Sequence, residues 1–241
     1  MTDAVARQRA YYEATAASYD AAHMEREHLV ALHLLSAFIE MAGIRSVLDV
    51  GAGTGRAMRF LKARFPDLLI KGIEPVAGLR RQGHLQGIPE EDLIFGDGGA
   101  LPFEDGSFDL VCEFGVLHHV PRPQVVVAEM IRVAAKMVAI SDCNFMGQGP
   151  SWLRTIKWML WRARLWPLAD WLKTRGKGYT YSEGDGIAYS YSIFQNVEQL
   201  RATWKEVGVI ATAPNHAKDA GPMKGASHAL LIAQSRLREP S

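Results

Sequence analysis

Apolar residues recur every three or four positions in the first part of the chain, the spacing that puts side chains on one face of a helix. The series comprises Leu29, Leu32, Leu35, Ile39 and Ala42. We therefore predict that the segment from Asp3 to Ala42 is helical. Gly43 is placed to end its last helix, because glycine is favoured just beyond a helix C-terminus.

From Arg45 onward, short β-rich apolar runs alternate with helical stretches. The strand candidates are Ser46 to Val50, Leu69 to Glu74, Leu93 to Gly96, Phe108 to Phe114 and Met137 to Ser141. The helix candidates between them include Arg56 to Arg64 and Pro123 to Ala135. Runs such as Val47-Leu48 show no polar alternation, which is typical of strands buried on both faces. The alternation predicts βαβ units, and hence a parallel sheet covered by helices on both sides.

The last part of the chain repeats the theme. We predict that Asn196 caps a helix that runs through Val207, with Gln199 placed to bond back to the cap and Gly208 ending the helix. Two strand-like runs follow, Val209 to Ala213 and His228 to Ala233. A polar, glycine-containing loop joins them, so we expect them to pair antiparallel. The prediction is an open, doubly wound α/β sheet of seven strands, mostly parallel, whose last hairpin is antiparallel.

Residues 144–195 interrupt the alternation. They hold five of the six tryptophans, Trp152, Trp158, Trp161, Trp166 and Trp171. Lysine and arginine are frequent there, and Asp170 is the single acid before Glu183. We interpret this stretch as an inserted helical cap. The chain is then one domain in four parts: an N-terminal helical segment (1–43), a core (44–143), the cap (144–195), and a C-terminal helix with edge strands (196–241).

Composition narrows the class of protein. The chain has 241 residues, 48% of them apolar and 22% charged, which is ordinary for a globular domain. A net charge of +1 offers no global field for nucleic acid, so we expect no nucleic-acid partner. Cys112 and Cys143 are too few for a disulfide framework, and we expect buried thiols. The N-terminus has no apolar signal-peptide region and no apolar run is long enough to span a membrane, so we expect a cytoplasmic protein. We expect it to be a monomer or a homodimer.

A glycine-rich turn follows the first buried strand, in the segment VLDVGAGTG. Gly51, Gly53 and Gly55 have the spacing GxGxG, and such a turn brings backbone close to a ligand. Dinucleotide-binding proteins favour GxGxxG, which would need glycine where Arg56 stands. A GxxxxGK phosphate loop is also absent from the sequence.

Acidic and glycine residues stand at the ends of the other predicted strands. Asp49 precedes the glycine turn, Glu74 ends the second strand, and Asp97 follows the third within GDG. Phe114-Gly115 ends the fourth. Ligands of open α/β sheets bind outside the carboxyl ends of the strands, so these residues are expected to meet in one crevice. The alternative for each acid is a helix cap or a hydrogen bond within its loop.

Four segments together resemble a known family. VLDVGAGTG, GIEP, GDGGALPFEDGSFDLVCEFGVLHHV and EMIRVAAKMVAISD are similar, in order and spacing, to the successive motifs of class I methyltransferases of the type 11 subgroup. The resemblance covers about residues 45 to 142 and implies a Rossmann-like fold that uses S-adenosyl-L-methionine. Relatives usually have a proline-glycine-glycine turn before the fifth strand, whereas this chain reads RVAAKMVAI, which shortens that turn.

The resemblance also implies roles for individual residues. Gly51 and Gly53 would contact the methionine part of the cofactor through backbone, Asp49 its amino group, and Glu74 the ribose hydroxyls. Asp97 and Gly98 would bind the adenine, and Phe114 with Gly115 would line the floor beneath the transferred methyl. Tyr19 resembles a tyrosine that closes over the cofactor, and Arg26 is a candidate for its carboxylate. For Tyr19 and Arg26, simple packing or a loop bond is an equal alternative.

Methyl transfer to a neutral hydroxyl or an ammonium requires that the acceptor lose a proton. His118 and His119, just after the fourth strand, are candidates for the base because imidazole titrates near neutrality. His119 is also the preferred cofactor contact of the two. The alternative is that either ring packs or hydrogen-bonds in its loop. The remaining histidines show no metal-ligand spacing, so we predict no metal.

The cap bears on the acceptor and leaves three interpretations open. It can act as a lid over an apolar acceptor, lie on a membrane surface as a basic amphipathic helix, or simply pack. The candidate acceptor contacts are Trp152, Tyr179, Tyr181, Tyr189 and Tyr191. The sequence therefore predicts methyl transfer to a small or amphiphilic acceptor such as a natural-product intermediate, a quinone or lipid, or a sugar. The rivals are a nicotinamide-dependent dehydrogenase on the same fold and a non-catalytic partner that binds the cofactor.

Overall fold

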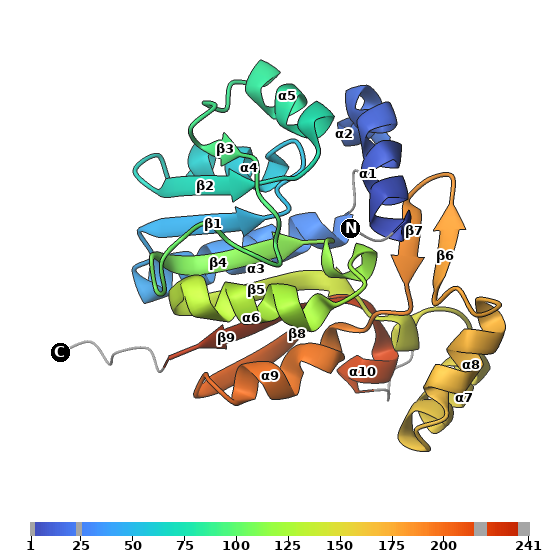
Figure 1. Cartoon of the computed structure of the whole chain (residues 1–241). Helices are drawn as coiled ribbons and strands as arrows, with labels where there is room; N and C mark the ends of the chain where they lie inside the picture. The colour runs from blue at the N-terminus through green and yellow to red at the C-terminus, as the bar shows by residue number, and fades with distance from the viewer. Residues whose placement is uncertain (1–2, 23–25, 215–220, 236–241) are drawn as a thin grey trace.

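The computed structural model describes residues 3–22, 26–214 and 221–235. Its centre is a seven-stranded sheet in the order β3-β2-β1-β4-β5-β9-β8, drawn in Figure 1. Strands β1 to β5 run parallel, and β9 and β8 are antiparallel to their neighbours. The seven main strands are β1 Ser46–Val50, β2 Leu69–Ile73, β3 Leu93–Ile94, β4 Phe108–Phe114, β5 Ala134–Cys143, β8 Glu206–Pro214 and β9 Ala226–Gln234. The predicted fold class, including the antiparallel last hairpin, is confirmed.

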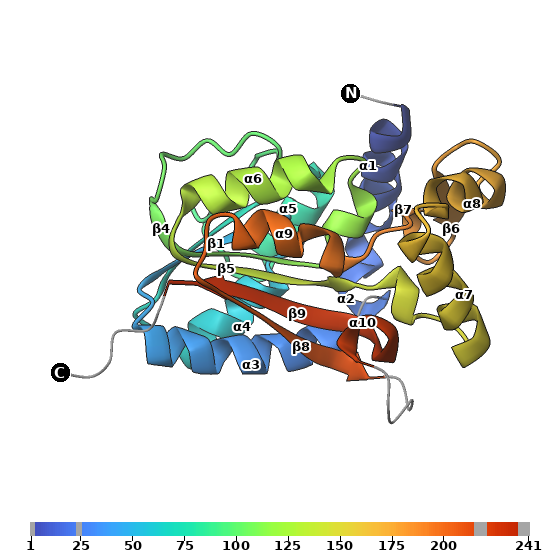
Figure 2. The same cartoon turned by 90° about the horizontal axis from the view of Figure 1, so that it is seen from below.

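Helices cover both faces of this sheet, as Figure 2 shows. They are α1 Asp3–Thr15, α2 Tyr19–Ala22, α3 Arg26–Ala42, α4 Arg56–Arg64, α5 Ala77–Leu85, α6 Pro123–Val133, α7 Ser151–Arg162, α8 Trp166–Lys173, α9 Val197–Arg201 and α10 Pro222–Gly225. Apolar residues of α3 and α4, such as Leu35 and Leu61, pack with one face of the sheet. Those of α6 and α9, such as Met130 and Leu200, pack with the other. The two buried layers fix the positions of the strand ends that form the site.

The elements of the central βαβ units lie close to their predicted bounds. β1, β4 and α4 match the predicted ranges, because continuous apolar runs and the glycine turn mark their ends. Helix α6 ends at Val133 and β5 begins at Ala134, so no separate turn joins them. This agrees with the shortened turn read from RVAAKMVAI. Both cysteines are buried and free, as expected.

The predicted helix after Asn196 was too long. Helix α9 ends at Arg201, and β8 begins at Glu206, so Val207 and Gly208 belong to a strand. The tertiary structure overrides the local signal here, because residues from Glu206 onward pair with β9 along the edge of the sheet. The side chain of Asn196 does not cap the helix and instead donates to Oε1 of Gln199.

The insertion contains more than helices. After α7 and α8, the chain forms a small antiparallel hairpin of β6 Tyr179–Ser182 and β7 Gly186–Tyr189. In Figure 1 the two helices project from the body, whereas the hairpin turns back toward α1. Within the described residues, no helix is both long and apolar enough to cross a membrane.

Candidate functional site

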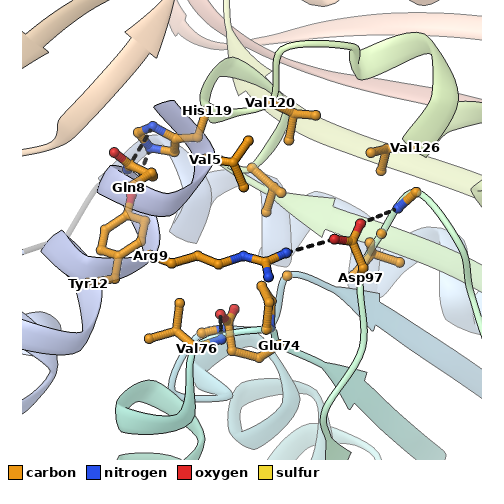
Figure 3. Close-up of a pocket in the computed structure, with 18 of the residues that line it drawn as sticks. Val5, Gln8, Arg9, Tyr12, Glu74, Val76, Asp97, His119, Val120 and Val126 are labelled. Atoms are coloured by element: carbon orange, nitrogen blue, oxygen red, sulfur yellow. Dashed lines mark hydrogen bonds and ion pairs between the residues drawn. The ribbon is translucent and has the colours of Figure 1, made fainter. Parts of the chain in front are cut away.

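A cavity of about 660 Å³ opens at the carboxyl ends of the parallel strands. Its floor and walls come from the ends of β1, β2 and β4, from the loop after β3, and from α6, while α1 covers it (Figure 3). Most of the predicted cofactor-binding residues line it, whereas Asp49 and Arg26 do not. The lining ones are Tyr19, Gly51, Gly53, Glu74, Asp97, Gly98, Phe114, Gly115 and His119. The structure thus brings together residues spread over a hundred positions of sequence.

The glycine turn forms one wall of the cavity. Gly51 has a φ of +73°, and a Cβ built on it would lie 2.6 Å from Cγ2 of Val116, so a larger residue would meet both strain and a collision. Its backbone N–H donates to the carbonyl oxygen of Ile73, at 2.9 Å. Gly53, with a φ of +59°, faces the ring of Tyr19, whose nearest atom is 3.6 Å from where a Cβ would stand. The turn is therefore shaped for a backbone contact with a ligand.

Glu74 is tied to this turn. Its Oε2 accepts from the N–H of Gly53 at 3.0 Å, and its Oε1 accepts from the N–H of Val76 at 2.8 Å. Burial raises the pKa of Glu74 to about 7, although these two hydrogen bonds act in the opposite direction. Asp49 lies behind the turn, and burial together with the nearby charge of Glu74 raises its pKa to about 7. Burial therefore outweighs the charges of Arg9, Arg56 and Arg80, which favour the ionised forms of these acids.

Asp97 lies across the cavity from Glu74. Its Oδ1 accepts from the N–H of Gly99 at 2.9 Å, and its Oδ2 forms an ion pair with Arg9 at 2.7 Å. Figure 3 shows the Arg9 side chain reaching from α1 between the two acids. The computed structure therefore has a cation in the acidic part of the cavity.

Helix α1 supplies side chains that the sequence analysis did not select. Val5, Gln8, Arg9 and Tyr12 line the cavity, and their spacing of three and four residues puts them on one helical face. The ring of Tyr12 packs edge-on against Tyr19 and against His119. The spacing of three and four residues was the signal in the sequence that could have identified this helical face. The face was missed because it mixes polar and apolar residues, unlike the apolar face of a helix that packs on a core.

His119 lines the cavity and is held on both sides. Its Nδ1 donates to the carbonyl oxygen of Ile187 in β7 at 2.5 Å, because a carbonyl can only accept. In the neutral form of the ring this leaves Nε2 as an acceptor, and the hydroxyl of Tyr12 lies 2.8 Å from it. The carboxylate of Asp185 lies 3.3 Å from the same nitrogen.

His118 does not line the cavity, and it bridges two acids. Its Nδ1 lies 2.7 Å from Oδ1 of Asp142, which is fully buried at the end of β5, and its Nε2 lies 3.6 Å from Asp185. Burial would lower the pKa of His118, but the charges and hydrogen bonds of Asp142 and Asp185 outweigh burial and raise it well above its ordinary value. Burial would raise the pKa of Asp142, yet the charge of His118 holds it below its usual range. The two carboxylates therefore favour the protonated form of His118.

Asp142 and Asp185 are functional candidates that the sequence analysis did not select. Asp97 was selected because it follows a strand, and Asp142 likewise lies near the end of β5. Asp142 was not selected because it is still part of the largely apolar strand, which ends at Cys143. Asp185 is at the tip of the β6–β7 hairpin, which the sequence did not predict. Among the described residues, His118, His119 and Asp185 come close enough for their ligand atoms to share an ion, as do His118, Asp142 and Cys143. No spacing in the sequence pointed to either group.

The other selected residues lie elsewhere. Arg26 is exposed at the start of α3, and Trp152 is exposed on α7. Tyr191 is buried in the core, where its hydroxyl donates to Oδ1 of Asn196 at 2.6 Å. Tyr179, Tyr181 and Tyr189 lie on the β6–β7 hairpin. None of these residues is among those that line the cavity.

The chain has relatives in sequence. Residues 48–138 match the methyltransferase domain of the type 11 family. A 97-residue stretch is 37% identical to an uncharacterized methyltransferase of Mycobacterium avium and covers 39% of this chain and 37% of that protein. A stretch of 163 residues is 29% identical to a demethylmenaquinone methyltransferase of a Roseiflexus species, covering 67% of this chain and 66% of that one. A phthiotriol/phenolphthiotriol dimycocerosates methyltransferase of Mycobacterium ulcerans is 31% identical over 109 residues, which are 45% of this chain and 40% of that one.

The match to the first of these relatives thus spans little more than a third of its length. Solved structures share the fold. A methyltransferase of Thermotoga maritima superimposes with a TM-score of 0.62 at 16% identity, covering 94% of this chain and 99% of that one. The magnesium protoporphyrin IX methyltransferase of Synechocystis gives 0.58 at 12% identity, covering 98% of each chain. Residues 48–138 are thus a methyltransferase domain of the type 11 family, whose members use S-adenosyl-L-methionine as the methyl donor, and the chain has the fold of class I methyltransferases.

Proposed function

We propose that this chain transfers a methyl group from S-adenosyl-L-methionine to a small, apolar or amphiphilic acceptor. The observation that carries the proposal is the convergence of Gly51, Glu74, Asp97 and His119 on one cavity at the strand ends. These residues come from four separate loops. Their meeting there is what the family resemblance predicts for a cofactor crevice.

The residues present fit this cofactor. The backbone cradle at Gly53 faces the aromatic ring of Tyr19, and an aromatic face suits a cationic sulfonium group. Glu74 and Asp49 are buried acids, and a cationic ligand would add to the arginine charges that favour their ionised forms. The apolar side chains of Val76 and Leu79 offer a wall for a flat ring.

We assign the cofactor contacts from this donor set. Backbone atoms of Gly51 and Gly53 would hold the methionine part, Glu74 the ribose hydroxyls, and Asp97 with Gly98 the adenine. When bound, the cofactor supplies a methyl group on sulfur that a nucleophile displaces in line. The protein contributes by orienting the acceptor, by excluding water beneath α1, and by removing a proton.

We assign the proton acceptor to Nε2 of His119. The bond from Nδ1 to the Ile187 carbonyl fixes the tautomer and turns Nε2 toward the cavity. The hydroxyl of Tyr12 lies 2.8 Å from this nitrogen, which supports the approach of an acceptor hydroxyl along the same direction. The acceptor hydroxyl or ammonium would take that place and give its proton to Nε2.

His118 has a different role in this proposal. Asp142 and Asp185 favour its protonated form, which makes it the less suitable of the two histidines for accepting a proton. It instead holds the tip of the hairpin against the end of β5, which keeps Ile187 bonded to His119. We therefore propose His118 and Asp142 as positioning residues.

The acceptor class follows from the cavity wall and agrees with the relatives. Val5, Val120 and Val126 make one side of the cavity apolar. Two of the relatives are named as methyltransferases of demethylmenaquinone and of phthiotriol dimycocerosates. We therefore favour a quinone- or lipid-like acceptor over a sugar.

Binding measurements test the cofactor assignment first. We expect S-adenosyl-L-methionine and its demethylated product to raise the thermal unfolding midpoint, and NAD to leave it unchanged. Stabilisation by NAD alone would refute the proposal. Incubation with methyl-labelled cofactor and fractionated cell extracts then identifies the acceptor, and we expect the label in the apolar fraction.

A further inference from the structure

Large apolar side chains are concentrated on the outer surface of α7 and α8. Among the described residues, fifteen large apolar or aromatic side chains are exposed, and eight of them lie between residues 152 and 172. They are Trp152, Ile156, Met159, Trp161, Leu165, Leu168, Trp171 and Leu172. We call this set the α7–α8 surface. Monomeric proteins rarely expose so many apolar groups together unless the patch binds something.

The orientation of α7 is fixed by its opposite face. Trp152, Ile156 and Met159 follow the i, i+4, i+7 spacing of a single stripe. On the other side, Nη1 of Arg154 donates to the carbonyl oxygen of Lys224, and Nζ of Lys157 donates to that of Phe145. The helix is therefore attached to the body through its polar side, and the apolar stripe points outward.

Helix α8 is attached in the same manner. The Oγ of Ser190 donates to Asp170, and the ring of Trp166 stacks on Phe145 with centroids 4.4 Å apart. Leu168 and Leu172, exposed by 58% and 62%, lie on the opposite face. Two adjacent helices thus present their apolar sides to solvent.

The same segment carries a strong positive charge. Between residues 151 and 177 stand seven basic residues, Arg154, Lys157, Arg162, Arg164, Lys173, Arg175 and Lys177, against the one acid Asp170. The rest of the chain has 20 basic and 25 acidic residues, so the charge of the protein is polarised. Two copies meeting through this surface would bring two positive patches together, which disfavours a dimer of this kind.

We infer that the α7–α8 surface docks on an anionic lipid bilayer. Tryptophan and leucine on one side of a helix with lysine and arginine around them is the pattern of helices that lie in a membrane interface. Each basic residue near an anionic surface contributes about 1 kcal/mol at moderate salt. The apolar side chains enter the headgroup region, and the basic side chains that do not attach the helices to the body, such as those of Arg162 and Lys177, reach the phosphates.

Docking there would bring the cavity toward the bilayer. Figure 1 shows α7, α8 and the hairpin at the end of the sheet where the parallel strands finish. The hairpin joins this surface to the site directly, since Asp185 and Ile187 contact His119. The acceptor would then be an amphiphile taken from the lipid phase. This last step rests on the proposed function, whereas vesicle binding does not.

Cosedimentation of the full chain with vesicles tests the inference, without any methyl donor present. We expect binding to vesicles of equal phosphatidylglycerol and phosphatidylcholine at least about tenfold tighter than to phosphatidylcholine alone, and weaker binding at high salt. The double variant L168E/L172E should lose about a hundredfold or more, because it places charges where apolar groups insert. The variant R162Q/K177Q should lose about thirtyfold.

The matched control is Leu85→Glu, at a leucine of α5 that is 79% exposed and distant in sequence from the surface. It should bind vesicles as the unmodified chain does, and all variants should keep their thermal unfolding midpoints. Absence of binding to anionic vesicles at low salt would overturn the inference, as would an equal loss in Leu85→Glu. A dimer that L168E/L172E converts to monomer, without vesicle binding, would assign the surface to a second copy instead. Failure of cofactor binding would refute the proposed function and leave this result standing.

Discussion

The cofactor crevice and the insertion lie at the same end of the sheet, yet they treat polar groups in opposite ways. In the crevice, acids such as Asp49 and Glu74 are buried, and hydrogen bonds from nearby backbone hold Glu74 in place. In the insertion, apolar residues such as Leu168 and Trp171 are exposed, and polar residues make the attachment to the body. Buried acids and exposed apolar side chains both cost free energy in water. A bound partner of matching chemistry lowers that cost in each case.

The two regions differ in how firmly the central sheet fixes their binding surfaces. The crevice is built from strand ends whose positions the central sheet fixes, so it suits one cofactor. Helices α7 and α8 project from the body, and their outer surface is separate from the crevice. Among the described residues, the hairpin joins the two regions through contacts such as those of Asp185 and Ile187 with His119. Changes in one region should therefore leave the other nearly unaffected unless they involve this hairpin.

The largest expected effect is at His119. Replacing it with glutamine removes the proton acceptor, and we expect the turnover number to fall by about 10²- to 10⁴-fold with little change in cofactor affinity. The measurement is the rate of methyl transfer to the acceptor found by labelling. His33→Gln, at an exposed histidine of α3, is the control. Full activity of His119→Gln would exclude this residue as the base.

Glu74 tests the crevice alone. Glu74→Gln keeps the shape of the side chain but removes its charge, and we expect the dissociation constant of S-adenosyl-L-methionine to rise by about 10- to 100-fold, since hydrogen bonds to charged groups contribute about 1.5–3 kcal/mol. Calorimetric titration gives this value. Glu90→Gln, at an exposed glutamate, should bind as the unmodified chain does. Vesicle binding should not change in either variant.

The buried acids of the crevice predict that the affinity for a cationic ligand depends on pH. The pKa values of Asp49 and Glu74 are raised to about 7, so both acids are partly protonated near neutrality in the free protein. A cationic ligand favours their ionised forms. Its affinity should therefore rise by up to about tenfold from pH 6 to pH 7, and should level off above pH 8. A constant affinity from pH 6 to pH 8 would contradict this, and Glu74→Gln should show a weaker dependence.

The smallest effect concerns Tyr191, at the base of the insertion. Tyr191→Phe leaves Oδ1 of the buried Asn196 without its donor, and we expect the free energy of unfolding to fall by about 1–2 kcal/mol. Denaturant titration measures the loss. Cofactor affinity should stay the same, because this tyrosine does not line the cavity. If Tyr191→Phe instead weakened acceptor binding and left stability unchanged, the prediction from the sequence that Tyr191 contacts the acceptor would be supported.

Sequence patterns were sufficient where local rules decide the structure. The glycine turn, the apolar strands and their acidic ends follow from backbone geometry within a few residues, and β1, α4 and β4 were predicted to the residue. Long-range contacts decide the remainder. Gln8 and Tyr12 reach His119 from α1, and Asp185 reaches it from a hairpin in a segment interpreted as a helical cap, although its strands contain tyrosine, threonine and isoleucine. Pairing with β9 likewise turned the predicted end of α9 into β8.

The position of β9 has a consequence for how the chain is made. This strand is the last of the described ones along the chain, yet it lies between β5 and β8 in the sheet. During synthesis, β5 therefore keeps an open, apolar edge until β9 has left the ribosome, whereas β1, β2 and β4 can pair earlier. Open strand edges promote aggregation. Nascent chains that end before Ala226 should consequently depend on chaperones far more than chains that include β9.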